Sequence, residues 1–284
     1  MVRRSLLYTP GDDRDMLETA VETDADAVIF DLEDAVAPDA RDDARETVRA
    51  TLDDLDDPGP ELCVRINPYD RCGRDDVDAV VGDTGTPPDS IVLPKAEGAA
   101  DVAQLRDHLV DLGADDIDVI PLVETAAGIV AVEETAAAPG VDAVAYGDQD
   151  YTADVGATVT DEKTESLYAR QRVVAAAGAA GVGALDTVYT DIEDREGLRE
   201  QTQRVVEFGF DGKLAIHPDQ VPVINEAFTP DAESIEWAER VVEGQRAAET
   251  DGTGVFTVDG QMIDPPLVER AERILDRADA ADAR

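Results

Sequence analysis

The chain has 284 residues, of which 43% are hydrophobic, so it can bury one large core and is predicted to form one large domain or one domain with an appendage. Its 66 Asp and Glu residues outnumber its 24 Lys and Arg residues, and the formal net charge of −42 excludes nucleic acids and anionic membranes as expected partners, because both would repel it. Since the Debye length falls to ~3 Å at ~1 M salt, this charge indicates a protein of a halophile, adapted to a salt-rich cytoplasm.

Two further features favour a cytoplasmic location. The opening residues, MVRRSLLYTPG, hold too short an apolar stretch for a signal peptide, and no apolar run approaches the ~20 residues of a membrane span. Cys63 and Cys72 are nine positions apart, which is neither a metal-binding spacing nor the pattern of a disulfide framework. We therefore expect both cysteines to be free thiols.

Apolar, β-branched runs alternate with helical periods along the chain. The predicted strands, in chain order, lie in residues 4–10, 26–34, 61–68, 89–97, 117–125, 141–150, 182–191 and 211–218. A helical segment follows each strand, as in residues 11–25, 38–55, 99–113 and 162–178. Residues 229–284 then form a predicted helical extension with a turn or short hairpin in its middle.

Strands that are apolar on both faces, each followed by a helix, indicate a parallel sheet, and eight such units predict its closure into a (β/α)8 TIM barrel. The expected division is a barrel of residues 1–228 and a C-terminal extension, or lid, of residues 229–284. An open doubly wound sheet is the alternative fold. No Gly-x-Gly-x-x-Gly motif follows any strand, so nothing indicates a dinucleotide site.

Active sites of this fold lie at the carboxyl ends of the strands. The polar residues that follow the apolar runs are Asp31, Glu33, Asp34, Arg65, Asn67, Lys95, Glu124, Asp150, Asp186 and His217. Strand ends are polar in any case, but this set contains Arg, Lys and His in a chain whose surface is mostly acidic. The sequence therefore predicts a polar site at the barrel mouth.

Glu124 and Asp150 belong to consecutive strand ends, and Glu124 lies in the apolar context VIPLVETAAGIV. Two neighbouring carboxylates repel unless a cation or a proton lies between them. Oxygen ligands without histidine suit a hard ion such as Mg²⁺ that keeps waters and takes substrate oxygens. A shared proton, or a helix N-cap by Glu124 on the TAAG turn, are the alternatives.

Several blocks together resemble the citrate lyase beta-subunit-like family of the HpcH/HpaI aldolase superfamily, which includes malyl-CoA, β-methylmalyl-CoA and citramalyl-CoA lyases. These blocks are RSLLYTPG, DAVIFDLEDAVAPDARDDAR, VRIN, VLPKAE, VETAAG, YGDQDYTADVG, FGFDGKLAIHPDQ and DGQMIDPP, and they span about residues 4–280. The resemblance implies a barrel with a C-terminal lid, a homo-oligomer (trimer or hexamer), and Mg²⁺-dependent reversible cleavage of a 3-hydroxyacyl thioester.

The same resemblance implies roles for particular residues. The metal ligands fall on Glu124 and Asp150, the arginine that binds a substrate oxygen on Arg65, and the general acid/base on Asp264 of MIDPP. Glu33 and Asp34 match acids that hold metal-bound water and orient the arginine. Gln149 departs from the acid that many relatives have before the metal aspartate, and the scarcity of lysine leaves the CoA phosphate contacts open.

Other candidates carry a competing structural interpretation. Arg14 is a weak candidate for binding a CoA phosphate, and Lys95 either binds a substrate carboxylate or balances the neighbouring acids. From its position alone, Asp264 is an N-cap. We expect His217 to hydrogen-bond at a helix start and Asp186 to cap the loop after its strand. Tyr8 is expected to pack rather than react, and Trp237 to lie in the core of the extension.

The resulting prediction is a carbon–carbon lyase that cleaves malyl-, β-methylmalyl- or citramalyl-CoA to acetyl- or propionyl-CoA and a 2-oxo acid, glyoxylate or pyruvate. A citrate lyase beta subunit, acting on an acyl-carrier-protein thioester inside a complex, is the alternative within enzymes. A non-catalytic barrel that binds acyl-CoA as a regulator is the alternative from another class. A hydrolytic step after the cleavage stays open.

Overall fold

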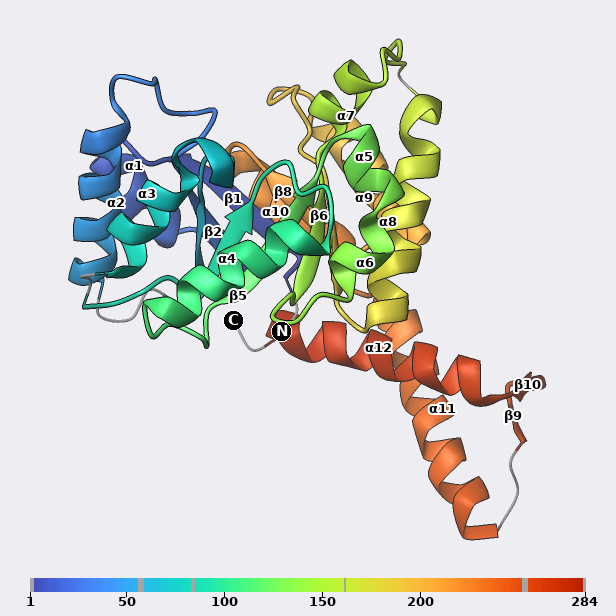
Figure 1. The fold of residues 1–284 in the computed structure, drawn as a ribbon. Helices are drawn as coiled ribbons and strands as arrows, with labels where there is room; N and C mark the ends of the chain where they lie inside the picture. Colours follow the sequence, from blue (N-terminus) through green and yellow to red (C-terminus); the bar gives the residue numbers. More distant parts are fainter. Residues whose placement is uncertain (1–2, 56–58, 83–84, 161, 252–254, 283–284) are drawn as a thin grey trace. The chain divides into compact units, whose positions relative to one another are not determined.

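The computed structural model describes residues 3–55, 59–82, 85–160, 162–251 and 255–282. Eight parallel strands close into a barrel in sequence order, each paired with its neighbours and β8 with β1, which confirms the predicted TIM barrel over the open sheet (Figure 1). The strands are β1 (Ser5–Pro10), β2 (Ala27–Asp31), β3 (Glu61–Arg65), β4 (Ser90–Leu93), β5 (Asp118–Val123), β6 (Ala143–Tyr146), β7 (Gly183–Asp186) and β8 (Gly212–Ala215).

Helices lie around this barrel and connect its strands. They are α1 (Arg14–Val21), α2 (Arg41–Asp54), α3 (Arg74–Val77), α4 (Ala99–Asp111), α5 (Ala126–Val130), α6 (Val132–Ala136), α7 (Asp148–Asp154), α8 (Leu167–Ala180), α9 (Arg195–Phe208) and α10 (Val221–Phe228). Short helical turns add η1 (Tyr69–Gly73), η2 (Asp78–Gly82), η3 (Thr164–Ser166) and η4 (Pro218–Gln220). The chain divides into two compact units, and the boundary falls within α10, after Ile224.

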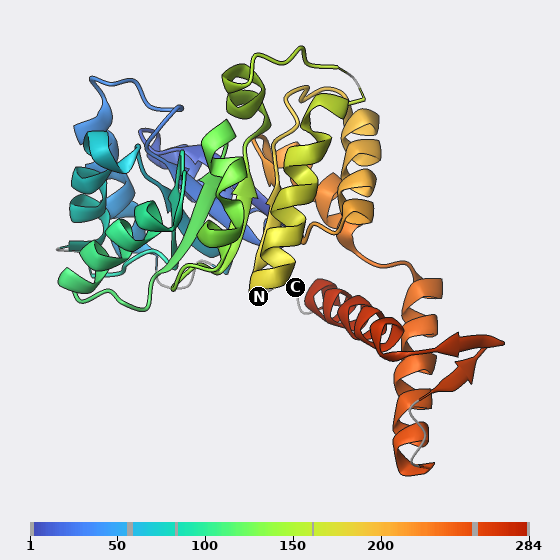
Figure 2. The same cartoon turned by 45° about the vertical axis from the view of Figure 1, so that its right-hand side comes forward.

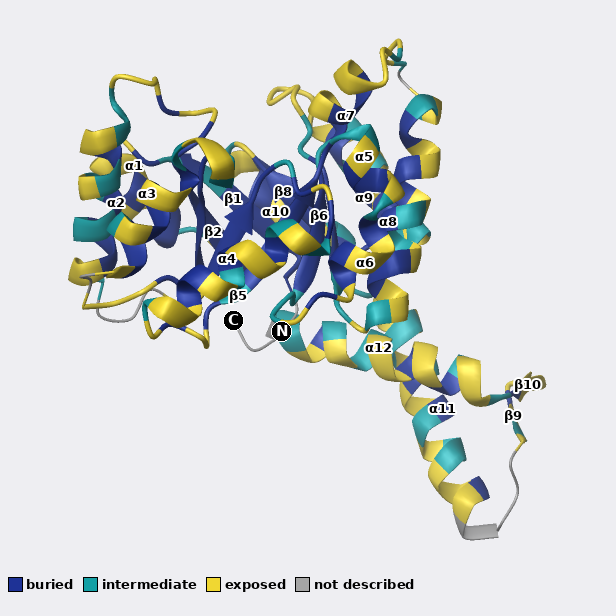
Figure 3. Ribbon diagram, in the orientation of Figure 1, coloured by how far each residue is buried: buried dark blue, intermediate teal, exposed yellow. Residues whose placement is uncertain are grey.

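The barrel interior is filled by side chains that alternate along the strands. Leu6, Ile29, Ile120 and Leu214 are buried members of this core, and Tyr8 packs against it from the next inward position of β1. Figure 3 shows the strands almost entirely buried, with exposed faces on the outer side of the helices. Because successive strand residues point to opposite faces, the apolar runs of the sequence supply both the interior and the helix-facing layer.

The C-terminal unit is built on α11 (Ala232–Asp251) and α12 (Pro265–Asp282), which pack against one another beside the hairpin of β9 (Phe256–Val258) and β10 (Gln261–Ile263) (Figure 2). Asp259 and Gly260 both have positive φ, 51° and 82°, as a two-residue hairpin turn requires. Trp237 packs against the unit's apolar cluster around Val241 and Ile263, as predicted. No helix in the described ranges is long and apolar enough to cross a membrane.

The large acidic excess leads to a prediction about stability. Raising KCl from ~0.1 M to ~1 M shortens the Debye length from ~10 Å to ~3 Å, so repulsion among the surface carboxylates behind the net charge of −42 should weaken. We expect the midpoint of thermal unfolding, followed by circular dichroism, to rise steeply over this range. A midpoint that does not change with salt would contradict the halophilic interpretation.

Candidate active site at the barrel mouth

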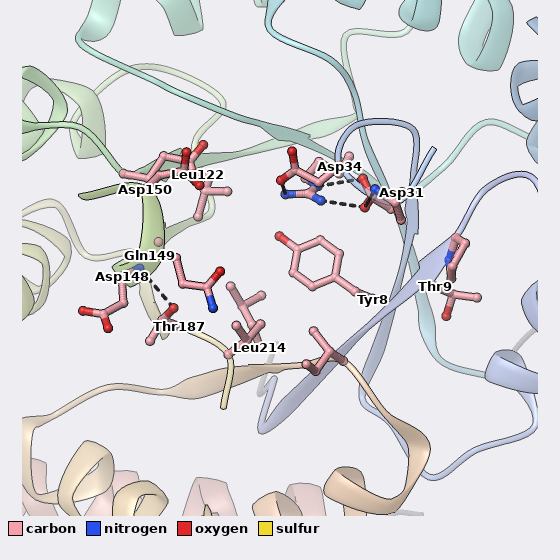
Figure 4. Close-up of a pocket in the computed structure, with 17 residues that line it drawn as sticks. Tyr8, Thr9, Asp31, Asp34, Leu122, Asp148, Gln149, Asp150, Thr187 and Leu214 are labelled. Atoms are coloured by element: carbon pink, nitrogen blue, oxygen red, sulfur yellow. Dashed lines mark hydrogen bonds and ion pairs between the residues drawn. The ribbon is translucent and has the colours of Figure 1, made fainter. Parts of the chain in front are cut away.

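A cleft of about 350 Å³ lies at the carboxyl ends of the strands (Figure 4). Its lining brings together side chains from β1, β2, β3, β5, β6, β7 and β8 or from the loops that follow them. Leu122, Val188 and Leu214 give it an apolar floor, and Arg65, Glu124 and Asp150 are among its charged groups. With Asp34, the structure therefore brings four of the predicted site residues to one cavity.

Arg65 is the last residue of β3 and is held by three carboxylates from the end of β2 and the loop after it. Its Nε and Nη2 donate to the two oxygens of Asp31 at 2.7 and 2.6 Å, and its Nη1 donates to Asp34 at 3.2 Å. A Glu33 oxygen lies 3.1 Å from Nη1, close enough for an ion pair but without hydrogen-bond geometry. The guanidinium also lies over the Tyr8 ring, 4.7 Å from its centroid. These contacts fix Arg65 in one orientation.

Glu124, directly after β5, and Asp150, in the first turn of α7, share one cation. The ammonium of Lys95 lies 2.8 Å from an Asp150 oxygen and 3.7 Å from a Glu124 oxygen. The backbone N–H of Lys95 also donates to Glu124 at 3.0 Å, and this residue takes a left-handed φ of 52°. Gly147 is required beside them, because a Cβ there would lie 2.6 Å from Glu124. The structure thus places Lys95 as a balance for neighbouring acids, one of its two predicted interpretations.

Two buried carboxyls of the mouth have raised pKa values. Burial raises the pKa of Glu124 to about 7, against the opposing effect of the nearby Lys95. Burial likewise raises the pKa of Glu33 to about 8, although Arg65 works to lower it. Because the charged form of each is poorly stabilised by the protein alone, additional positive charge between these oxygens would be favourable.

The mouth fits a hard divalent cation in its chemistry. Glu124 follows β5, Asp150 lies in the helical turn after the neighbouring strand β6, and both offer carboxylate oxygens whose combined charge one ammonium leaves uncompensated. No group of three or more His, Cys, Asp or Glu side chains in the described part of the chain forms a metal cage. Mg²⁺ commonly uses one or two carboxylates and completes its shell with waters and substrate oxygens. Glu124 and Asp150 are the residues that would hold it.

A second charged network supports the first turn of α7, which carries Asp150. Asp148 donates its backbone N–H to Thr187 Oγ1 at 3.1 Å and accepts from Lys163 Nζ at 3.0 Å and from the Tyr146 hydroxyl at 3.0 Å. Burial, the largest single effect, raises the pKa of Asp148, but the hydrogen bond and the charge of Lys163, together with Arg170 and Ser166, outweigh it, and the pKa is lowered. The first turn of α7 is therefore anchored at its buried side.

The prediction that Asp186 caps the loop after its strand is wrong. Asp186 ends β7 and is fully buried, where one oxygen lies 2.9 Å from the Lys213 ammonium and the other lies 3.1 Å from Arg170. Lys213 also donates to the Thr187 carbonyl at 2.6 Å. A buried carboxylate needs such charged partners, and those partners come from β8 and α8. His217, in contrast, accepts from the N–H of Asp219 at the start of η4, as predicted.

Arg14 and Asp264 are predicted site residues that are not among those lining the cleft. Arg14, at the start of α1, donates to Glu18 at 2.7 Å and to Asp54 at 2.6 Å on the exposed surface. Asp264 belongs to the C-terminal unit, immediately before α12, and lines a separate depression there. Its side chain accepts from the Leu267 N–H at 3.4 Å, a weak version of the N-cap contact. Their roles in CoA binding and in proton transfer stay predictions.

Sequence reasoning included Asp31 among the strand-end acids but gave it no role, and it gave none to Asp148 or Thr187. Asp31 makes the two-pronged contact to Arg65, and the signal available was the pairing of β2 with β3, which sets Asp31 opposite Arg65 at the ends of adjacent strands. Thr187 has no comparable signal, because its role depends on the position of a backbone N–H.

The fold and site define a (β/α)8 barrel with a carboxylate-rich, arginine-containing mouth. A family model described as HpcH/HpaI aldolase/citrate lyase matches residues 4–218, and the chain belongs to this family. It is 37% identical to mitochondrial citramalyl-CoA lyase of Mus musculus over 96% of this chain and 85% of that protein. It is 36% identical to citrate lyase subunit beta of Leuconostoc mesenteroides subsp. cremoris, over 98% of this chain and 94% of the subunit.

A solved structure is similar to this chain over nearly its whole length. The crystal structure of CitE from Mycobacterium tuberculosis in complex with magnesium, acetoacetate and coenzyme A matches 96% of this chain and 97% of that chain, with a TM-score of 0.77 and 35% identity. The family resemblance and the barrel predicted from the sequence are both confirmed.

Proposed function

We propose that this protein is a Mg²⁺-dependent carbon–carbon lyase that cleaves a 3-hydroxyacyl-CoA thioester of the malyl-, β-methylmalyl- or citramalyl-CoA type. The products are acetyl-CoA or propionyl-CoA and a 2-oxo acid, and the reaction is reversible. The observation that carries the proposal is the convergence of Arg65, Glu124 and Asp150 on one cleft, in a family whose members include the citramalyl-CoA lyase and citrate lyase subunit beta compared above.

Magnesium is the cofactor that suits this cleft. It is present in the structure of the CitE relative, and here Glu124 and Asp150 supply the anionic oxygens that a hard ion prefers. When bound, Mg²⁺ supplies a Lewis acid for the carboxylate and carbonyl oxygens of the 2-oxo acid. Glu33, whose buried Oε2 lies 3.1 Å from Arg65 Nη1, is proposed from the family resemblance to hold a water near the ion.

The chain's own residues supply charge stabilisation and proton transfer. Cleavage turns the substrate hydroxyl into a carbonyl and leaves the electrons of the broken bond on the thioester fragment as an enolate. Arg65 faces the cleft as a permanent cation, with Asp31 and Asp34 fixing its plane, and stabilises developing negative charge. Asp264 is proposed as the general base for the hydroxyl proton, which requires the C-terminal unit to close over a barrel mouth.

The citrate lyase beta subunit is the competing enzyme, because it shares this chemistry and differs in its thioester carrier. The similarity to the Leuconostoc subunit, 36% identity, is nearly as high as that to the mouse lyase, 37%, so identity does not separate them. The regulatory barrel is disfavoured, because regulation does not need buried acids with raised pKa values beside an ordered arginine.

A substrate panel tests the proposal. We expect the purified protein, in high salt with Mg²⁺, to release acetyl-CoA or propionyl-CoA from at least one of malyl-, β-methylmalyl- and citramalyl-CoA, followed by mass spectrometry. Free malate or citramalate among the products would identify an added hydrolytic step. Turnover of citryl-carrier-protein alone, with no reaction on any CoA thioester, would reassign the chain to the citrate lyase reaction.

A further inference from the structure

Tyr8 occupies the centre of the cleft, although the family resemblance assigned it no role. It follows Leu6 by two residues on β1, so both side chains point into the barrel, and Tyr8 forms the layer nearest the mouth. In Figure 4 the Tyr8 ring projects into the cavity. Its hydroxyl is directed away from β1, toward the space between Asp34 and Asp150. This residue is thus placed among the charged groups of the site.

The Tyr8 hydroxyl is available to a ligand. Among the described residues, no protein group makes a hydrogen bond to it, whereas Tyr146 of β6 donates its hydroxyl to Asp148. Burial raises the pKa of Tyr8 well above its ordinary value, and the positive charge of Arg65 only partly opposes this. The phenol therefore keeps its proton at any working pH and can act as a donor.

Arg65 has fewer N–H groups left to bind a substrate oxygen than its position at the mouth suggests. A guanidinium has five N–H donors, and three hydrogen bonds already join this one to Asp31 and Asp34, with a Glu33 oxygen 3.1 Å from Nη1. Arg65 therefore supplies charge but few unoccupied donors. The Tyr8 ring lies against the guanidinium at 4.7 Å, so the phenol and the cation face the same part of the cleft.

We propose that Tyr8 is a catalytic residue whose hydroxyl donates a hydrogen bond to the thioester oxygen as it becomes the enolate oxygen, beside Arg65. The inference rests on the proposed lyase function and adds a hydrogen-bond donor to its catalytic residues. No proton moves from Tyr8: the electrons of the broken carbon–carbon bond pass to the thioester fragment, the hydroxyl proton of the substrate passes to the general base, and the enolate carbon then takes a proton from the protonated base to give the acyl-CoA product. Tyr8 stabilises the oxyanion and remains a phenol.

Tyr8→Phe tests the inference, because it removes one oxygen and keeps the ring against Arg65. We expect kcat for cleavage to fall by ~100-fold or more, the usual effect of removing one oxyanion donor, while KM, the Mg²⁺ requirement and the thermal unfolding midpoint in high salt stay close to wild type. Tyr168→Phe is the matched control, because Tyr168 is 60% exposed on α8 and lines no part of the cleft.

A second measurement follows the formation of the enolate separately from carbon–carbon cleavage. In D₂O with Mg²⁺, the wild type should exchange the α-hydrogens of its acyl-CoA product, and Tyr8→Phe should slow this exchange by a similar factor. Rates within twofold of wild type in both assays would overturn the role of Tyr8 while leaving the lyase function intact. A wild type that neither cleaves nor exchanges would instead overturn the proposed function, and the Tyr8 inference with it.

Discussion

Glu124→Gln and Asp150→Asn are each expected to reduce turnover far more than the loss of a residue that only contacts a metal ligand. Such a loss typically costs ~10–100-fold. Each change keeps the size of the side chain but replaces an anionic oxygen pair by an amide, which a hard divalent ion binds poorly. Glu124 should be the more sensitive position, because it is 3% exposed and its raised pKa of about 7 reflects a charge that needs a cation.

Binding of Mn²⁺, used as a paramagnetic substitute for Mg²⁺ and followed by electron paramagnetic resonance, gives a readout independent of turnover. We expect one site in the wild type and its loss in both variants. Glu134→Gln, which removes the same charge from the exposed face of α6, is the matched control and should behave as wild type. Wild-type Mn²⁺ affinity in Glu124→Gln or Asp150→Asn would show that these carboxylates do not hold the metal.

Asp264→Asn is expected to lower kcat by ~10²–10⁴-fold, the contribution of a positioned acid or base. The substitution separates two functions of the residue. Asp264 precedes α12 and accepts weakly from Leu267 N–H, and asparagine is as good an N-cap as aspartate, so α12 should begin at the same residue. Asp264→Ala, which loses both functions, should add a loss of stability of about 1 kcal/mol.

The family resemblance suggests that the extension of one subunit closes over the barrel mouth of its neighbour, and mixing two inactive variants tests whether Asp264 acts in this way. When Glu124→Gln and Asp264→Asn subunits are exchanged, some mouths will combine intact Glu124 with an intact Asp264 from another chain, and a fraction of the activity should return. Exchange verified by mass spectrometry, with activity still at background, would show that Asp264 serves its own barrel. Full activity of Asp264→Asn alone would leave only the N-cap role.

The barrel was predictable because its signal is local. Each of the eight strands is a short apolar run with a polar end, and these runs coincide with β1 to β8. The same pattern placed Arg65, Glu124 and Asp150 at strand ends, and strand order alone brings their side chains to one mouth. Sequence periodicity thus predicted which residues meet, since a closed parallel barrel aligns the ends of all its strands.

The partners of these residues were less predictable, because they depend on side-chain geometry. Asp186 has the same sequence context as the other strand-end acids, yet it lies below the mouth with Arg170 and Lys213. The path of the Lys95 side chain to Glu124 and Asp150 depends on a left-handed backbone conformation that no pattern in the sequence indicates. Tyr8 was expected to pack, and its ring does pack, but only the structure shows where its hydroxyl points.

The most direct test of the central claim is product analysis on metal-free protein. The protein is treated with a chelator in high salt, given the CoA thioester that the substrate panel identifies, and titrated with Mg²⁺ while both products are quantified. We predict no cleavage before Mg²⁺ is added, and afterwards equal amounts of acyl-CoA and 2-oxo acid. Cleavage at the same rate without any divalent ion, or release of free CoA without a 2-oxo acid, would contradict a Mg²⁺-dependent carbon–carbon lyase.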